Sequence, residues 1–217
     1  MITQLLSKYA QLCPDKTFIV SDSYKYSFKS FLDLVQSGAN YLNEIELSRV
    51  YLYAFDSAQL VALILSTELL GKEVCVLNRS FTHTQVEKII ESLGEGLLVT
   101  DSDFRFQDKF KRIKLNYCFQ NLGQSPGFTK PNGKLIILTT GTTGVPKAVS
   151  YSWKTLFSQT NFRKHKSKGD DLVWLLAYPL NHIAGIQILN YAKAAKAMLV
   201  IPRSYNYDDI SRANVYF

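Results

Sequence analysis

The sequence predicts an α/β fold in which parallel strands form doubly wound sheets flanked by helices. Between Val50 and Thr100, short apolar runs alternate with stretches of helical periodicity, in the order strand, helix, strand, helix, strand. Strands joined through helices in this way pair in parallel by right-handed crossovers. A second observation is Lys134–Thr139, a strongly apolar run that leads directly into a loop of glycine and threonine. Together these features are typical of a doubly wound sheet.

The N-terminal region is expected to contain a helix, two short strands and a second helix. Apolar spacing predicts the first helix over Thr3–Leu12, which a proline–aspartate pair then breaks. Strands are predicted at Thr17–Val20 and Tyr24–Tyr26. From Ser27 onward, apolar residues recur at helical spacing, and Ser27 is placed to cap the first turn of this helix.

The central unit carries start and stop signals for its helices. Strands are predicted at Val50–Tyr53, Glu73–Leu77 and Leu97–Thr100, with helices at Ser57–Leu70 and Thr84–Leu93. Gly71 suits the C-terminal end of the first helix, because glycine adopts the left-handed conformation readily. Thr84, followed three residues later by Glu87, predicts a capping box at the start of the second helix.

The C-terminal half continues the α/β pattern after a polar, irregular segment at Asn121–Gly133. Further strands are predicted at Ala148–Tyr151, Leu172–Ala177 and Ala197–Ile201, with helices at Ser152–Phe162 and Ile183–Ala195. The last four residues, Asn214–Phe217, have the character of a beginning apolar strand.

The composition is that of a folded globular protein. Hydrophobic residues make up 47% of the 217 residues and charged residues 20%, which argues against disorder. No uncharged apolar stretch reaches the ~18 residues of a membrane helix, and the N-terminus lacks the features of a secretory signal. Cys13, Cys75 and Cys118 fit neither a disulfide framework nor a metal site. We therefore expect a cytoplasmic protein with no membrane span and no metal-ligating residues.

The net charge of +7 invites a nucleic-acid interpretation. Basic clusters at residues 109–114 and 163–168 could contact phosphates. No recognition motif accompanies this charge. The alternative is a pair of solvated faces whose charge favours an anionic substrate such as a nucleotide or CoA. We therefore expect no nucleic-acid partner.

The loop after Lys134–Thr139 has the chemistry of a phosphate-binding loop. Its two glycines permit unusual φ values and bring backbone N–H groups close to an anion. Its threonines add hydroxyl groups and its lysine adds a positive charge. The candidate residues are Thr139, Thr140, Gly141, Thr142, Thr143, Gly144 and Lys147. Their spacing differs from that of the Walker A motif. The structural alternative is a flexible surface hairpin between two strands.

The order of residues in this loop resembles a family motif. Residues 140–149 are similar to Ser-Gly-Thr-Thr-Gly-x-Pro-Lys-Gly-Val, which is typical of the adenylate-forming (AMP-binding) acyl-CoA synthetases and ligases. Thr140 replaces the usual serine, and Ala148 replaces the usual glycine. In that family the loop closes over the β- and γ-phosphates of ATP. The resemblance therefore implies that these residues, Lys147 included, bind the phosphates of ATP.

A second motif lies downstream, in Tyr178–Gly185. It is similar to the family's Pro-x-x-His-x-x-Gly segment, and within the family it is most similar to that of o-succinylbenzoate–CoA ligases. The resemblance implies that His182 and Gly185 border the pocket for the carboxylate substrate. A histidine at this place could instead cap its helix or be a satisfied core residue. His83 and His165 lack such a context, and we expect both at the surface.

The resemblance extends loosely over nearly the whole chain and implies the large N-terminal domain of these ligases in truncated form. We expect one partial domain over residues 1–217, an α/β unit over 49–120, and the phosphate loop with the start of the acid-pocket subdomain over 134–217. The family's later segments, which bind adenine and ribose and supply a catalytic lysine, do not occur in these 217 residues. We therefore expect no catalytic residue here.

The function that the resemblance implies is ATP-dependent acid–thiol ligation. A small carboxylic acid would be activated as an acyl-adenylate with release of pyrophosphate, with Mg²⁺ present and CoA as the thiol. We expect the chain alone to be inactive, and an unfinished sheet edge at its apolar terminus to favour association. Two alternatives remain open: a non-catalytic α/β binding module derived from the family, and part of an amino-acid or aryl-acid adenylation domain.

Overall fold

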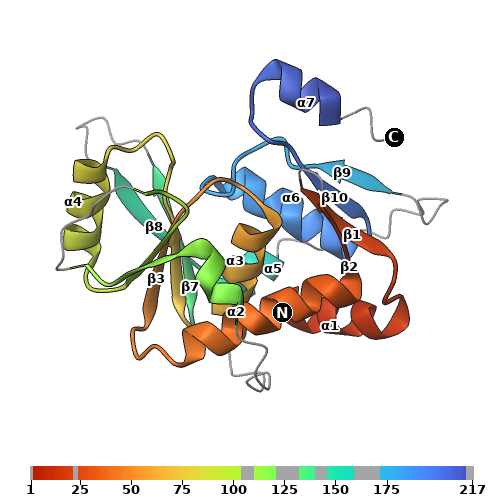
Figure 1. Cartoon of the computed structure of the whole chain (residues 1–217), viewed down its shortest axis with the longest axis horizontal. Helices are drawn as coiled ribbons and strands as arrows, with labels where there is room; N and C mark the ends of the chain where they lie inside the picture. Colours follow the sequence, from red (N-terminus) through yellow and green to blue (C-terminus); the bar gives the residue numbers. More distant parts are fainter. Residues whose placement is uncertain are drawn as a thin grey trace.

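The strands of the protein form two sheets, in a computed structural model that describes residues 2–21, 24–103, 110–120, 132–139, 146–158 and 172–213 (Figure 1). The smaller sheet has four strands in the order β2-β1-β10-β9. Its strands are β1 (Thr17–Ser21), β2 (Tyr24–Ser27), β9 (Val173–Leu175) and β10 (Met198–Ile201). β10 pairs in parallel with both β1 and β9, whereas β2 is antiparallel to β1.

The larger sheet has six strands in the order β6-β5-β3-β4-β7-β8. They are β3 (Arg49–Tyr53), β4 (Glu73–Val76), β5 (Leu97–Thr100), β6 (Arg112–Lys114), β7 (Lys134–Thr139) and β8 (Lys147–Ser152). All neighbours pair in parallel except β7 and β8, which form an antiparallel hairpin. The predicted parallel order of the central unit is therefore confirmed, within sheets that are mixed.

Helices flank the two sheets. The helices of the described residues are α1 (Ile2–Leu12), α2 (Phe28–Asn43), α3 (Ala58–Leu70), α4 (His83–Leu93), α5 (Trp153–Ser158), α6 (Ile183–Ala194) and α7 (Tyr207–Ala213), with a 3₁₀ helix at Leu115–Phe119. Figure 1 shows α4 on the outer side of the larger sheet and α2 and α3 in the middle of the molecule, between the two sheets. This arrangement matches the predicted doubly wound architecture.

The alternation of side chains along β3 explains how one strand contributes residues to two hydrophobic cores, one on each face of the sheet. Val50 and Leu52 belong to the main core, which also contains most of α3. Tyr51 and Tyr53 point to the opposite face and pack with the apolar side of α4. Successive side chains of a strand alternate between faces, so an all-apolar β3 requires a helix layer on each side. α3 is buried almost all round, as expected for a helix between two sheets.

The predicted cap at Ser27 and the predicted helix end at Gly71 are both confirmed. The Ser27 side chain accepts a hydrogen bond from the backbone N–H of Ser30, at the start of α2. Ser57 caps α3 in the same way through Leu60, and Gly71 ends that helix in the left-handed conformation with φ of 68°. These signals lie within one turn of the helix end, which is why the sequence alone reveals them.

The capping box predicted at Thr84 and Glu87 is wrong. α4 begins at His83, and its N-cap is Thr82, two residues before the predicted cap. The backbone N–H of Gln85 donates to the Thr82 hydroxyl, and the Gln85 side chain accepts from the Thr82 N–H at 2.8 Å. Thr82 and Gln85 satisfy the same Ser/Thr-x-x-Glu/Gln pattern, and the structure selects this pair.

Other differences concern element bounds. The sequence did not predict β6, the 3₁₀ helix or α7, while α5 covers only the first part of the helix expected at Ser152–Phe162. The remainder of that prediction lies outside the described residues, as do Asn214–Phe217 and most of Asn121–Gly133. β7 and β8 extend the sheet that the central unit begins, and the expected domain boundaries stay predictions. In the described part of the chain, no helix is long and apolar enough to cross a membrane.

Candidate functional site

The β7–β8 hairpin places two of the predicted phosphate ligands opposite each other. Thr139, the last residue of β7, is paired with Lys147, the first residue of β8. The Thr139 hydroxyl donates to the Lys147 carbonyl oxygen at 3.2 Å, and both side chains are exposed. The other candidates in this loop lie outside the described residues: Thr140, Gly141, Thr142, Thr143 and Gly144. The hairpin therefore presents a hydroxyl and an ammonium group at one end of the larger sheet.

The carboxyl ends of the neighbouring strands carry a cluster around Arg79. The Arg79 guanidinium lies over the rings of Tyr53 and Phe55, at 4.6 and 4.4 Å from their centroids. It also lies 3.4 Å from a carboxylate oxygen of Asp101. The other Asp101 oxygen accepts a hydrogen bond from the Phe55 N–H at 2.8 Å. This cluster fixes the loop that follows β3.

The turn that carries His182 lies between β9 and α6. His182 is the N-cap residue of α6, but its side chain makes no capping hydrogen bond. Its backbone N–H donates to the Pro179 carbonyl oxygen at 3.0 Å, and the residue is exposed. The imidazole is therefore neither a helix cap nor part of the core, and it is available to a ligand.

Gly185 is required by the packing of this same turn. A β-carbon at position 185 would lie 2.3 Å from the Pro179 carbonyl oxygen and 2.6 Å from the Tyr178 carbonyl oxygen. Real β-carbons essentially never lie closer than 3.0 Å to such atoms. The first turn of α6 therefore sits directly against the backbone of residues 178–179, and only glycine permits this approach.

Asp56 joins this turn to the larger sheet. One carboxylate oxygen of Asp56 accepts hydrogen bonds from the Leu180 N–H at 3.1 Å and from the Tyr205 hydroxyl at 2.5 Å. Burial raises the pKa of Asp56, while the bonds from Tyr205 and Leu180 and the charge of His182 lower it. Burial and the nearby carboxylate raise the pKa of Tyr205, so its hydroxyl remains a donor. Neither Asp56 nor Tyr205 is evident as a site residue from the sequence, because no local pattern indicates a contact between residues so distant in the chain.

The helix that begins at His182 is anchored at its other end by a buried charge. Lys193 is 4% exposed, and Glu68 of α3 is fully buried. Burial lowers the pKa of Lys193 to about 8, against the opposing effect of the Glu68 carboxylate. The Thr3 N–H donates to Glu68 at 3.1 Å. α6 is thus tied to both α3 and α1 through Glu68.

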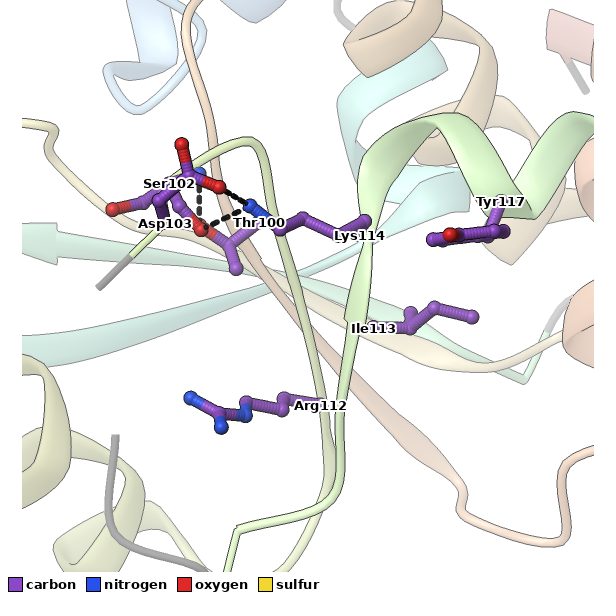
Figure 2. Close-up of a pocket in the computed structure, with 7 residues that line it drawn as sticks. All are labelled: Thr100, Ser102, Asp103, Arg112, Ile113, Lys114 and Tyr117. Atoms are coloured by element: carbon purple, nitrogen blue, oxygen red, sulfur yellow. Dashed lines mark hydrogen bonds and ion pairs between the residues drawn. The ribbon is translucent and has the colours of Figure 1, made fainter. Parts of the chain in front are cut away.

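A separate hollow of about 470 Å³ lies at the carboxyl ends of β5 and β6 (Figure 2). Its lining residues are Thr100, Ser102, Asp103, Arg112, Ile113, Lys114 and Tyr117. The Lys114 ammonium donates to the Ser102 carbonyl oxygen at 3.0 Å and contacts the Asp103 carboxylate. No residue predicted for the site lines this hollow, which lies at the opposite edge of the sheet from the β7–β8 hairpin. The positive charge of Lys114 in this hollow is already partly neutralised by Asp103, and we do not include the hollow in the candidate site.

The described residues give no sign of a built metal centre. No group of three or more His, Cys, Asp or Glu side chains among them is arranged to hold a metal ion. The described part of the candidate site consists of the exposed Thr139 and Lys147 on the β7–β8 hairpin and the exposed His182 in the turn between β9 and α6, which we call the histidine turn.

This combination of sheets and motifs defines the adenylate-forming class of α/β proteins. The AMP-binding enzyme family matches residues 6–215, and the chain therefore belongs to that family.

Curated relatives are 2-succinylbenzoate–CoA ligases. The chain is 24% identical over 217 residues to the protein of Bacillus anthracis (strain A0248), covering 96% of this chain and 45% of the relative. It is 23% identical over 212 residues to that of Bacillus pumilus (strain SAFR-032), with coverage of 93% and 44%. The chain thus spans about 45% of the length of the curated relatives that it matches.

Solved structures with the same fold include further ligases. The o-succinylbenzoate CoA synthetase of Bacillus subtilis in complex with ATP and magnesium ion matches with a TM-score of 0.80 and 19% identity, over 98% of this chain and 60% of that chain. Its complex with the acyl-adenylate OSB-AMP matches with a TM-score of 0.81 and 20% identity, over 98% and 59%. The N-terminal domain of FACL13 from Mycobacterium tuberculosis matches with a TM-score of 0.83 and 16% identity, over 99% and 60%. The predicted fold is therefore confirmed as that of the N-terminal domain of these ligases.

Proposed function

We propose that the chain is the N-terminal part of an ATP-dependent acid–thiol ligase. The observation that carries this proposal is the residue order of the β7–β8 loop, within a chain that belongs to the AMP-binding family along almost its whole length. The reaction begins with attack of a substrate carboxylate oxygen on the α-phosphorus of ATP. The bond from that phosphorus to the pyrophosphate oxygen breaks, leaving an acyl-adenylate. A thiol then displaces AMP.

The acid that we propose is an aryl dicarboxylate of the o-succinylbenzoate type, with CoA as the thiol. Two observations support this choice. The relatives that match nearly the whole chain are named 2-succinylbenzoate–CoA ligases, and Tyr178–Gly185 is similar to the corresponding segment of that group. Fatty acids and amino acids are the competing substrates, and the experiment below separates them.

Lys147 and the hydroxyl groups of the loop are the groups that we propose to bind the β- and γ-phosphates. An ammonium group and hydroxyls are donors without any competing carboxylate, and this donor set suits an anion. Lys147 is exposed at the start of β8, with Thr139 paired to it. Mg²⁺, when present, neutralises charge on the triphosphate.

His182 and Gly185 are proposed to border the carboxylate pocket. The exposure of His182 and its freedom from any capping role support this assignment. We propose no catalytic residue within these 217 residues. We also propose a reducing cytoplasm as the compartment, since Cys13, Cys75 and Cys118 are all free thiols.

The test is a pyrophosphate-release screen of the full-length gene product, with ATP and a panel of aryl, fatty and amino acids. The proposal predicts release with the aryl dicarboxylate and little with the others. Release with an amino acid instead would assign the chain to an adenylation domain. The absence of release with every acid, from folded protein, would contradict the enzyme proposal and favour a non-catalytic binding module.

The 217-residue chain by itself is proposed to bind ATP weakly and to form no adenylate. Only the triphosphate segment of the family's nucleotide site occurs in it. Each missing hydrogen bond to adenine or ribose removes roughly 0.5–1.5 kcal/mol, and about 1.4 kcal/mol corresponds to a tenfold change in affinity. Calorimetry with ATP, GTP and pyrophosphate should therefore show weak binding without selectivity for the base. Tight binding that prefers ATP to GTP would contradict this.

A further inference from the structure

The residue that connects the histidine turn to the larger sheet belongs to neither of the motifs used above. Asp56 follows the carboxyl end of β3, whereas its two hydrogen-bond donors come from the region of the smaller sheet. Leu180 lies in the turn between β9 and α6, and Tyr205 lies in the segment that follows β10. A single carboxylate oxygen thus holds together three segments that are 124 and 149 residues apart in the sequence.

The backbone on either side of Asp56 is itself fixed. On one side, the Phe55 N–H donates to Asp101 at 2.8 Å, and the Phe55 ring lies against the Arg79 guanidinium. On the other side, Ser57 caps α3 through the Leu60 N–H at 3.2 Å. The loop that carries the Asp56 carboxylate is therefore rigid. Because this loop has little conformational freedom left to lose, a hydrogen bond to Asp56 can hold its partner in a defined position.

The histidine turn is consequently held by two contacts. α6 packs closely against residues 178–179, at the point where Gly185 leaves no room for a side chain. Asp56 binds the turn through the N–H of Leu180, which lies two positions before His182. Charge-assisted hydrogen bonds to a carboxylate are stronger than neutral ones, so this contact is suited to fixing the turn against the larger sheet.

We propose that Asp56, together with Tyr205, is a positioning residue that sets where the His182 imidazole stands relative to the larger sheet. Asp56 acts through Leu180 and does not itself contact the substrate. The effect of Asp56 on activity, through a correctly placed histidine at the carboxylate pocket, rests on the function proposed above. The effect of Asp56 on the position of the histidine turn does not depend on that function. The functional half and the structural half of the proposal can therefore be tested separately.

The structural half is tested by amide hydrogen exchange of the 217-residue chain. Asp56→Ala removes the acceptor of the Leu180 N–H, and exchange at Leu180 should rise by about tenfold or more, with altered NMR signals from His182. Asp33→Ala is the control, because it removes an exposed carboxylate of α2 that pairs with Lys29 and leaves the bonds of Asp56, Leu180 and Phe55 in place. Asp56→Asn keeps an amide oxygen as acceptor and should restore most of the protection. Tyr205→Phe removes only one of the two hydrogen bonds to Asp56, and it replaces Asp56→Ala in this test if that variant fails to fold.

The functional half uses the full-length gene product and the acid that it activates. Asp56→Ala should raise the KM for the acid by about tenfold, while the KM for ATP changes much less, and Asp56→Asn should recover part of the loss. Equal changes in both KM values would overturn a role specific to the histidine turn. Unchanged exchange at Leu180 and unchanged His182 signals in Asp56→Ala would overturn the positioning role outright, whether or not any acid is activated. A wild-type protein that activates no acid contradicts only the proposed function, because the exchange result still decides the structural half.

Discussion

The Gly185→Ala substitution tests the close packing of α6 against the histidine turn. The added β-carbon would lie 2.3 Å from the Pro179 carbonyl oxygen and 2.7 Å from the Pro179 carbonyl carbon. These are backbone atoms, and the Pro179 oxygen is already engaged by the His182 N–H at 3.0 Å. Neither group can rotate away as a side chain could, so α6 or the turn itself must move.

The magnitude follows from two opposing effects. Alanine is favoured over glycine inside a helix by about 1 kcal/mol. Overpacking a close contact costs about 1–3 kcal/mol, and the cost is greatest where the neighbouring atoms are rigid. We therefore expect a net loss of about 1–2 kcal/mol in the free energy of unfolding, accompanied by displacement of His182.

Gly38→Ala is the matched control for this prediction. Gly38 is also a buried helical glycine, but its β-carbon would meet side-chain atoms only, at 2.7 Å from the Ser66 hydroxyl and at 3.1 and 3.2 Å from atoms of Leu63 and Phe119. Urea denaturation of both variants, with NMR spectra of the His182 region, provides the comparison. If Gly185→Ala gained about 1 kcal/mol and left the turn unmoved, the close packing described here would be refuted.

Further predictions concern the helix start and the buried charge. Thr82→Ala should destabilise the protein by about 1 kcal/mol in urea denaturation, whereas Thr84→Ala should change stability by no more than a few tenths, because Thr82 is the cap; the opposite ranking would restore the capping box expected from the sequence. Glu68→Ala should cost about 3 kcal/mol by the same measurement, since it leaves the Lys193 ammonium buried without its carboxylate, and a cost below 1 kcal/mol would count against the pair. The pKa of Lys193 is about 8 in the folded state against an ordinary 10.5, so between these values the unfolded chain binds more protons and the contribution of Lys193 to stability rises with pH. The free energy of unfolding, measured at pH 7 and pH 10, should therefore rise for the wild type relative to Lys193→Met as the pH rises. An unchanged difference between the two proteins would contradict the lowered pKa of Lys193.

The features that the sequence predicted well are those that depend only on residues within one helical turn of each other. Ser57 and Gly71 bound α3 because a cap and a left-handed terminus need only neighbouring residues. The start of α4 was missed because Thr82 and Thr84 both satisfy the same local pattern. The distinguishing signal was the apolar pair Phe81 and Val86, which flank the true cap as a hydrophobic staple and pack in the same cluster.

Long-range contacts could not be predicted in the same way. β1 pairs with β10, so that Ile19 lies beside Leu199, and nothing in either short apolar run specifies that partner. The two candidate motifs were visible because each is contiguous, at Lys147 and at His182. The link between their two sheets through Asp56 depends on tertiary contacts alone, and only the structure reveals it.

Our proposal that the protein activates a carboxylate with ATP bound at the β7–β8 loop is tested by acid-dependent exchange of labelled pyrophosphate into ATP. Lys134, exposed at the far end of the same hairpin, provides the control for Lys147. The full-length gene product should catalyse exchange that depends on the aryl dicarboxylate. Lys147→Ala should weaken it by about 10- to 100-fold, as expected for a lost charged hydrogen bond, while Lys134→Ala should leave it nearly unchanged. Equal activity in the two variants, or no exchange with any acid, would contradict the account.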